Sequence, residues 1–551
     1  MKNSVSDRSF YIESDDEDEE KDLNNVDQGN DSDDSHEWND HDAMRKPSSY
    51  SMAWPQSYRQ SIDLLGSVPS PNIGFLGTTS LSRLGSSFIV PPLIKRHPPV
   101  PDTIPSAKKP LLQPTDIDDQ RRSSHSLHPP HLLRGSTRNV ISKVAHDHEV
   151  HFSGQCTFGQ AVLNGINALC GVGILSTPYA LKEGGWVALS VLFIFSAFSF
   201  YTGLLLRHCL DSEPGLETYP DIGQAAFGTS GRIFISVILY SELYACCIEY
   251  IILESDNLSS LFPNAHLSLG GLELNPHVLF AILTTLAILP TVYLRDLRIL
   301  SYLSACGVLA TTLVVLCLFW VGLIDNVGIH SKGTTINLAT FPVAMGLYGY
   351  CYSGHAVFPN LYTAMANRNQ FPAVLLVCFA LCTVMYAAVA IMGYTMFGEY
   401  TLSQYTLNMP QGIVATKLAV WTTVVNPFTK YPFTTYALSL TPVAKCLEEL
   451  IPLNDPKFNL YSIFIRTMLV VSTLLVGLSV PFFGLVMSLI GSLLTMFVSL
   501  ILPSACFLKI KWGKISQIQV ALCVTVMIVA VVSSAFGSYS AISEIIEQLF
   551  G

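Results

Sequence analysis

Two acidic residues within an apolar stretch are the first residues of this sequence that could do chemistry. Glu242 and Glu249 lie seven residues apart between residues 232 and 255, so they share one face of a helix. A carboxyl group inside a membrane is costly and usually serves a function. Both are therefore candidates to carry a proton. A buried pair with Lys430, which would serve structure, is the alternative.

His355 is a third titratable candidate, in another apolar stretch. The unperturbed pKa of histidine, about 6.5, lies near physiological pH and suits proton transfer. A structural role, in which the imidazole holds its own segment by a hydrogen bond, is equally compatible with the sequence.

The element expected to position these groups is a helix that the sequence interrupts. Residues 157–186 are apolar enough to enter a membrane, but their middle reads GVGILSTP, with two glycines and a proline. These residues favour a break. Because lipid cannot satisfy the freed backbone groups, such a break persists only where it lines a cavity or binds something. We therefore predict a substrate site at Gly171, Val172 and Gly173.

A second interruption lies between residues 341 and 361, which read FPVAMGLYGYCYSGHAVFPNL. Its glycines and its second proline weaken a continuous helix, and Tyr348 and Ser353 are polar for a lipid environment. Two interrupted helices at matching places indicate an inverted repeat with the substrate near the middle of the membrane. Tyr348, Ser353 and Gly354 are the residues that we expect this segment to contribute. Close helix packing through glycines is the alternative.

The composition is that of an integral membrane protein. Of 551 residues, 50% are hydrophobic and 13% are charged, whereas soluble domains carry about 25% charged residues. A spanning helix needs about 20 apolar residues. Eleven windows meet this need: 157–180, 186–208, 232–255, 276–294, 299–324, 341–363, 371–397, 413–441, 461–480, 482–508 and 517–541. The sequence therefore predicts an all-α integral membrane domain of eleven transmembrane helices over residues 151–551.

The loop charges predict how these helices are oriented. When the loops are assigned alternately to two sides, eleven Lys and Arg residues fall on the N-terminal side and only Lys182, Lys332 and Lys417 on the other. Cytosolic loops carry an excess of basic residues. We therefore expect a cytosolic N-terminus and a C-terminus on the far side of the membrane.

Residues 1–150 differ in character from the rest of the chain. They contain the acidic run ESDDEDEE, from Glu13 to Glu20, followed by a stretch rich in Ser, Pro, Leu and Arg. Such a segment cannot bury enough apolar surface to fold alone. We predict a disordered, acidic and Ser/Pro-rich cytosolic tail. It is either a simple solvated extension or a regulatory segment that is phosphorylated or bound by sorting proteins.

Several classes of protein are disfavoured by what the sequence lacks. The thirteen cysteines are scattered, mostly in apolar runs, and do not have metal-binding spacing. The sequence has no Gly-rich phosphate loop followed by Lys and Ser/Thr, and no nucleophile elbow. We therefore expect no enzymatic activity, no cofactor, no metal ion and no nucleic-acid partner.

At its two interruptions the sequence resembles a known family. NGINALCGVGILSTPYALKEGGW and YGYCYSGHAVFPNLYTAM are similar to the amino acid/auxin permease family, and within it to the vacuolar amino acid transporters of plants and fungi. The resemblance covers about residues 150–545. It implies eleven spans, a LeuT-like five-plus-five inverted repeat with helices 1 and 6 broken, and proton-coupled transport of amino acids.

An amino acid substrate gives the first break a chemical role. Its carboxylate and ammonium groups both need partners when they leave water. The free N–H groups after the break suit the carboxylate, and the unpaired carbonyls before it suit the ammonium. Asn164 and Asn167 precede the break and could orient these groups. Hydrogen bonding between helices is the alternative role for each asparagine.

The expected function is therefore secondary transport of neutral amino acids, with protons and the lipid bilayer as the other partners. In the vacuolar membrane, protons would leave the acidic lumen as amino acids enter it. The alternatives are a proton symporter in the plasma membrane and an amino acid sensor that signals through its tail.

Overall fold

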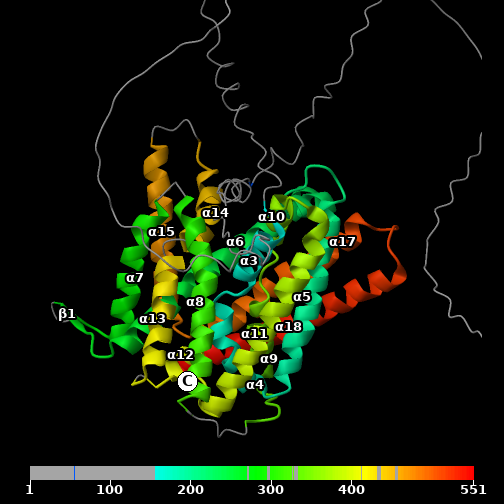
Figure 1. The fold of residues 1–551 in the computed structure, drawn as a ribbon. Coiled ribbons are helices and arrows are strands. Elements are labelled where there is room, and N and C mark those ends of the chain that lie inside the picture. Colours follow the sequence, from blue (N-terminus) through cyan, green and yellow to red (C-terminus); the bar gives the residue numbers. More distant parts are fainter. Residues whose placement is uncertain are drawn as a thin grey trace, which may run out of the picture. The chain divides into compact units, whose positions relative to one another are not determined.

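The computed structural model describes Pro55 and residues 156–551, except 270–271, 294–297, 326, 328–332, 411, 431–435 and 453–456. For residues 269, 272, 298–307, 423–430 and 437–438 it describes the backbone only. Apart from Pro55, the tail that we predicted to be disordered lies outside the described residues. The described chain is almost entirely helical, as its composition predicts (Figure 1).

Helices occupy the eleven predicted windows in the expected order. Seven windows hold one named helix each: α5 (Ala188–Leu210), α6 (Tyr219–Leu261), α7 (Pro276–Val292), α8 (Arg298–Leu323), α11 (Phe371–Phe397), α15 (Phe458–Ser479) and α18 (Gln517–Phe550). Two windows are broken: the first into α3 (Phe158–Leu169), η3 (Val172–Ser176) and α4 (Thr177–Gly184), and the sixth into α9 (Phe341–Cys351) and α10 (Phe358–Ala364). The eighth holds α13 (Val414–Lys430) and α14 (Ala437–Glu448), and residues 431–435 between them lie outside the described residues. The tenth is one helical run that changes between α and π geometry: α16 (Phe483–Leu489), η7 (Ile490–Thr495), η8 (Phe497–Ile501) and α17 (Leu502–Ile510).

Short elements lie between these spans. They are the hairpin of β1 (Leu267–Leu269) and β2 (Leu272–Leu274), and the helical turns η4 (Arg368–Gln370), η5 (Gly398–Tyr400) and α12 (Tyr405–Asn408). The two strands pair antiparallel, with Leu267 opposite Leu274.

Length and hydropathy support a membrane domain. Within the described residues, six helices are long and apolar enough to cross a membrane, and the bent pair of 158–169 and 172–184 raises the number to seven. The six are α5, α6, α11, α15, α18 and the run from α16 to α17. The other four predicted windows hold α7, α8, α9 with α10, and α13 with α14. Of α8, which has 26 residues, only 308–323 are described with side chains, so its full length is not counted here. The chain is therefore a multi-pass integral membrane protein.

The third span begins earlier than its apolar window. We predicted 232–255, but α6 starts at Tyr219, where Thr218 and Asp221 form a capping box. Gly228 then takes a φ of 70° inside the helix, which kinks it. This positive φ is readily available only to glycine. The first turns of α6 therefore form a separate arm before the long apolar part.

The two broken spans run antiparallel. The backbone of Cys156, before α3, pairs with the backbone of Ala364 and Ala366, after α10, through N–H···O distances of 3.0 Å. At the opposite end, the Thr340 hydroxyl, before α9, donates to the carbonyl of Glu183 in α4 at 2.7 Å. The first and sixth spans are thus joined at both ends and pass each other in opposite directions, as an inverted repeat requires.

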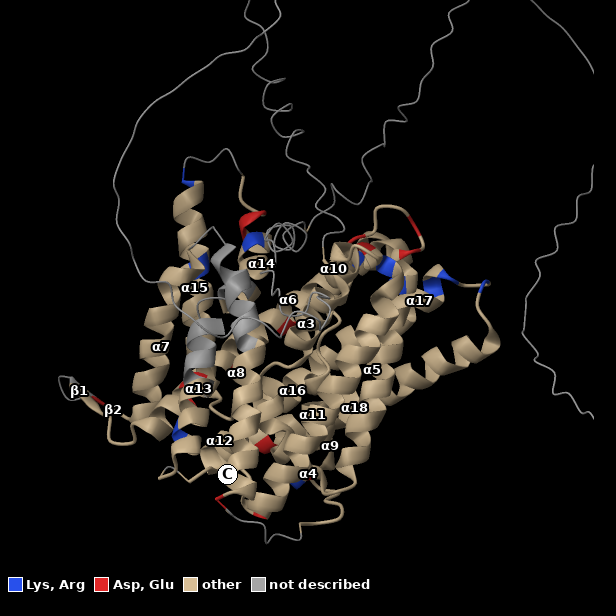
Figure 2. Ribbon diagram, in the orientation of Figure 1, with Lys and Arg blue, Asp and Glu red and all other residues tan. Residues whose placement is uncertain are grey.

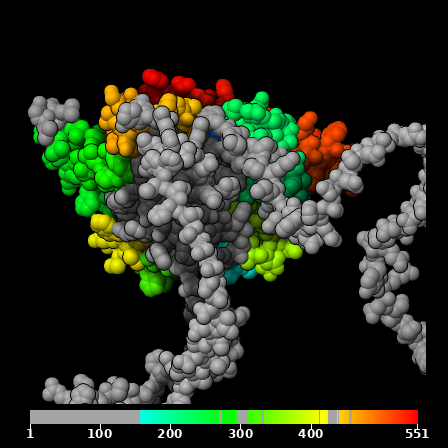
Figure 3. All heavy atoms as spheres, turned by 90° about the horizontal axis from the view of Figure 1, so that it is seen from above, coloured from blue at the N-terminus to red at the C-terminus, as the bar shows by residue number. Residues whose placement is uncertain are grey.

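Basic residues gather at one end of the helices. Figure 2 shows Lys and Arg at the tips of α14, α15 and α17, whereas the opposite end carries few, near α4 and α13. Figure 3 looks onto this end and shows green, orange and orange-red segments at separate places around its edge. The C-terminus lies at the other end (Figure 1). The asymmetry predicted from the loops is therefore present in space.

Candidate functional site

The first break has the position and the shape that its glycines favour. Helix α3 ends at Leu169, Gly171 has extended backbone angles (φ −83°, ψ −154°), and the 3₁₀ turn η3 begins at Val172 without a side-chain cap. Pro178 lies in the first turn of α4, where its missing N–H costs nothing. The two halves of the span are bent by 48°.

The second break faces the first. Six residues, 352–357, separate α9 from α10. A Cβ added to Gly173 would lie 3.3 Å from Sγ of Cys351, and one added to Gly354 would lie 2.9 Å from the side chain of Leu169. Glycine at these two positions lets each break approach the neighbouring broken helix. The structure therefore brings together the two segments in which we predicted the substrate site.

The other predicted substrate residues differ in how deeply they are buried. The Tyr348 hydroxyl is fully buried and points to the carbonyl of Thr177 at 3.5 Å. Val172 is buried, whereas Ser353 and Asn167 are half-buried. Asn164 is exposed, two turns before the break. Of the two asparagines, Asn167 in the last turn of α3 is therefore the nearer to the glycines along the helix.

Helix α11 holds both breaks from one side. The Tyr386 hydroxyl lies 2.6 Å from the carbonyl oxygen of Leu169 and 3.2 Å from that of Cys351, the last residues of α3 and α9. One hydroxyl proton can serve only one of these carbonyls at a time. One turn earlier, the Cys382 thiol lies 3.1 Å from that of Cys170. The carbonyl ends of both half-helices therefore meet at one tyrosine.

Glu249 connects the third span to the second break. The Tyr350 hydroxyl, in the last turn of α9, donates to Oε2 of Glu249 at 2.6 Å. Glu249 is 0% exposed, and its Oε1 has no hydrogen-bond partner among the described residues. No basic side chain in the described part of the chain forms an ion pair with it. A buried carboxyl group thus lies beside the predicted substrate segment.

Glu242 is held by a different element. Its Oε1 accepts a hydrogen bond from the Thr495 hydroxyl at 2.9 Å, in the π-helical turn η7. Such turns are often found at functional sites. The side chain of Lys430, the partner considered from the sequence, lies outside the described residues. The observed partners of the two glutamates are therefore hydroxyl groups.

His355 lies within the second break and faces α5. Its Nε2 lies 2.9 Å from the hydroxyl of Thr202 and 3.0 Å from the carbonyl oxygen of Ser199. The ring is fully buried and packs against Phe358, with 4.8 Å between ring centroids. These contacts fit the structural role that the sequence left open, in which His355 ties the non-helical segment to α5.

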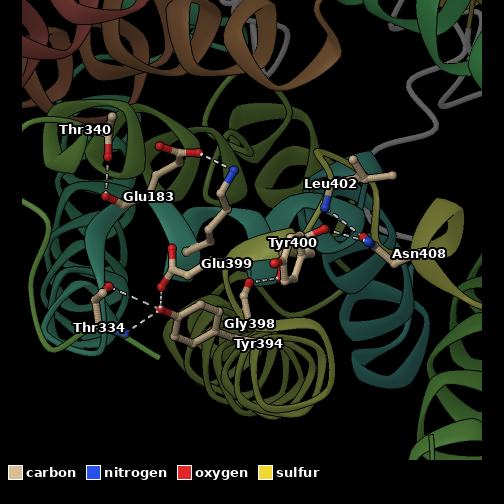
Figure 4. Close-up of polar contacts among 11 residues, drawn as sticks. Glu183, Thr334, Thr340, Tyr394, Gly398, Glu399, Tyr400, Leu402 and Asn408 are labelled. Carbon is tan, nitrogen blue, oxygen red and sulfur yellow. Dashed lines mark hydrogen bonds and ion pairs between the residues drawn. The ribbon is translucent and has the colours of Figure 1, made fainter. Parts of the chain in front are cut away.

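The far ends of the broken spans meet in a polar cluster, shown in Figure 4. The N–H of Thr334 donates to the Tyr394 hydroxyl at 2.9 Å, and this hydroxyl donates to Glu399 at 2.8 Å. Nearby, Lys182 and Glu183 form an ion pair of 3.2 Å at the end of α4. The loop before α9 is thereby joined to α4 and to the end of α11.

Sequence comparisons decide the family to which these helices belong. Residues 154–544 match the family model described as transmembrane amino acid transporter protein. The chain belongs to this family.

Relatives within the transmembrane amino acid transporter family match the chain over its full length. The amino acid transporter AVT1C of Arabidopsis thaliana is 63% identical over 556 residues, which cover 100% of both chains. The amino acid transporter AVT1B of the same plant is 60% identical over 554 residues, again 100% of both. These relatives are named as transporters, not enzymes.

Among solved structures, the crystal structure of MhsT in complex with L-phenylalanine matches with a TM-score of 0.44 and 12% identity, over 69% of this chain and 98% of that one.

In this family member, two side chains that hold the breaks were not predicted from the sequence. Tyr386 and Cys382 lie on a helix that reads as an ordinary apolar span. Their partners, Leu169 and Cys170, are more than 200 residues away in the sequence. The sequence did contain one indication of these contacts. Cys378, Cys382 and Tyr386 recur at intervals of four residues, so they share one face of α11.

Proposed function

We propose that this chain is a secondary active transporter that exchanges neutral amino acids for protons across the vacuolar membrane. Membership of an amino acid transporter family supplies the general class of substrate. The observation that carries the proton coupling is the buried Glu249 carboxyl group, which accepts the Tyr350 hydroxyl beside the second break.

The proposed substrate position lies between the two breaks. The carboxylate of the amino acid binds near the N–H groups of Val172 and Gly173, since a helix start attracts negative charge and no side chain caps η3. Its ammonium group binds the carbonyl of Cys351, which ends α9. The Leu169 carbonyl already accepts the N–H of Gly171 at 2.8 Å and the Tyr386 hydroxyl at 2.6 Å, so both of its lone pairs are used. Tyr348, Ser353 and Gly354 line the opposite side.

The proposed proton site is linked to this position through one residue. Tyr350 bonds Glu249, and the next residue, Cys351, donates its thiol to the carbonyl of Gly173 at 3.7 Å. A substrate that moves either break therefore disturbs the hydrogen bond to Glu249. A proton on this carboxyl group removes the cost of burying its charge. Glu242 lies seven residues earlier in α6 and offers a second proton position.

The proposed location rests on charge and on resemblance. The basic residues lie at the end where the chain enters the first span (Figures 1 and 2). This asymmetry supports a cytosolic N-terminus and a luminal C-terminus. The resemblance of the two breaks to vacuolar transporters supports the vacuolar membrane. There, protons leaving the acidic lumen would drive amino acids inward.

Transport into proteoliposomes tests this function. The purified full-length protein is reconstituted with an acidic interior, and radiolabelled neutral amino acids are added outside at neutral pH. Antiport predicts uptake that is several-fold above that without a pH gradient, together with alkalinisation of the interior. Uptake driven only by the reverse gradient would identify a symporter. Absence of uptake for all twenty amino acids would contradict transport and favour a sensor.

A further inference from the structure

A buried ion pair fastens the kinked start of α6. Nη1 of Arg232 donates to Oδ1 of Asp221 at 2.7 Å, and the two side chains are 2% and 0% exposed. The same nitrogen also donates to Oε1 of Gln224 at 3.2 Å. The other carboxylate oxygen of Asp221 accepts the N–H of Thr218 at 3.0 Å. Asp221 therefore caps the helix and binds Arg232 at once.

The guanidinium group has a further partner in the N-terminal tail. Its Nη2 donates to the carbonyl oxygen of Pro55 at 3.1 Å, across 177 residues of sequence. Pro55 is buried, and it belongs to the same compact unit as the helices, Ser48–Gly551. Proline has no backbone N–H, so its own backbone offers only the carbonyl oxygen as an acceptor. The planar guanidinium fork can donate to Asp221 and to this carbonyl together.

We propose that the Asp221–Arg232 pair is a docking site for the N-terminal tail, with the segment around Pro55 as its occupant. The charge of the pair supports this choice. Asp221 neutralises Arg232, so the remaining donor suits an uncharged backbone carbonyl better than an anion. The site therefore binds the tail through its backbone.

The position of the site gives docking a consequence for α6. Asp221 and Gln224 precede the kink at Gly228, whereas Arg232 follows it. The Pro55 carbonyl accepts a hydrogen bond from Arg232, the residue that joins these two parts of α6. Docking therefore stabilises the angle at which the arm before Gly228 meets the span that carries Glu242 and Glu249. The docked tail would act on α6 whichever ion is coupled to transport.

Amide hydrogen exchange on the full-length protein tests the docking. In one variant, residues 48–62 are replaced by a Gly/Ser stretch of equal length, and in a matched control the same replacement is made at residues 66–80. Loss of the docked segment should speed exchange across residues 219–236 several-fold, while the control leaves this region unchanged. Equal exchange in the two variants would show that the segment does not dock.

Binding of a separate peptide tests the same contact by a second measurement, in addition to the exchange of the Gly/Ser variant. A labelled peptide of residues 48–62 should bind the variant that lacks this segment, and a scrambled peptide should not. Arg232→Lys in that variant keeps the charge beside Asp221 but has only one nitrogen, so it cannot reach Asp221 and the Pro55 carbonyl with two separate nitrogens as Nη1 and Nη2 do. Since a hydrogen bond to a charged group is worth about tenfold or more in affinity, the peptide should bind at least that much more weakly. Unchanged affinity, or equal binding of the scrambled peptide, would contradict the proposal.

Discussion

The Tyr350 hydroxyl donates to Oε2 of Glu249 at 2.6 Å, and both residues are buried. Tyr350 belongs to the last turn of α9, so this bond ties the acidic face of α6 to a broken span. One oxygen of the carboxyl group is thereby held, while Oε1 has no partner among the described residues. In the proposed mechanism, this open oxygen takes the coupled proton, and the Tyr350 bond links that proton to the position of the break.

Replacing Glu249 with glutamine should uncouple transport from the proton gradient. Glutamine keeps the size and the acceptor oxygen for Tyr350, but it cannot exchange a proton near neutral pH. Uptake driven by a pH gradient should fall at least tenfold, whereas exchange of internal for external amino acid at equal pH should persist. Both are measured in proteoliposomes with radiolabelled substrate.

Glu273→Gln, at an exposed position in β2, is the matched control and should leave both rates unchanged. If Glu249→Gln retains its gradient-driven uptake, Glu249 does not carry the coupled proton. The same pair of measurements on Glu242→Gln would then test the second carboxyl group.

Replacing Tyr386 with phenylalanine should weaken the contact between the two breaks. The change removes the hydroxyl that lies 2.6 Å from the Leu169 carbonyl, which then keeps only its hydrogen bond from the N–H of Gly171. The loss of one such hydrogen bond costs about 0.5–1.5 kcal/mol. We expect a melting temperature lower by a few degrees and a raised KM for the amino acid.

Tyr405→Phe is the control for this change, because the Tyr405 hydroxyl is fully buried but has no hydrogen-bond partner among the described residues. Its removal should leave the melting temperature unchanged or raise it. Equal destabilisation by the two substitutions would show that the Tyr386 bridge contributes nothing specific.

The parts of the fold that follow from local chemistry could be predicted from the sequence. Apolar length located the eleven windows, and the glycines and proline of GVGILSTP marked the first break, because these residues disfavour a helix wherever they occur. The early start of α6 was missed because Tyr219 to Phe227 is not apolar. The capping residues Thr218 and Asp221 were its local signal.

Partners in the site could not be predicted in the same way. Helical periodicity placed Glu242 and Glu249 on one face, but it says nothing about what that face meets. Their observed partners, Thr495 and Tyr350, are 253 and 101 residues away in the sequence. Such pairings depend on how whole helices pack. The same limit hid Tyr386, whose partners lie in two other spans.

Replacing His355 with glutamine should reduce stability without changing the pH dependence of transport. The imidazole contacts Thr202 and Ser199 of α5 through a single nitrogen, and these contacts support a role in holding the second break. Glutamine retains one amide to make part of these contacts. We expect a lower melting temperature and a pH profile of unchanged shape, measured on the reconstituted protein.

His266→Gln, at an exposed position in the loop before β1, is the control and should change neither property. A pH profile of His355→Gln that loses one limb would instead assign a titrating role to His355.

Replacing Gly491 with alanine should disrupt the packing of α9 against η7. A Cβ added at Gly491 would overlap the backbone carbonyl of Gly346, which cannot turn aside as a flexible side chain can. The helices must then separate near Thr495, the residue that bonds Glu242. We expect most of the protein to be lost from the monodisperse fraction in size-exclusion chromatography, and the remainder to melt at lower temperature.

Gly159→Ala, in α3, is the matched control, because a Cβ added there meets nothing within 4 Å. Alanine there should match or exceed the native stability, since it favours a helix over glycine by about 1 kcal/mol. Native behaviour of Gly491→Ala would contradict the close packing of these two segments.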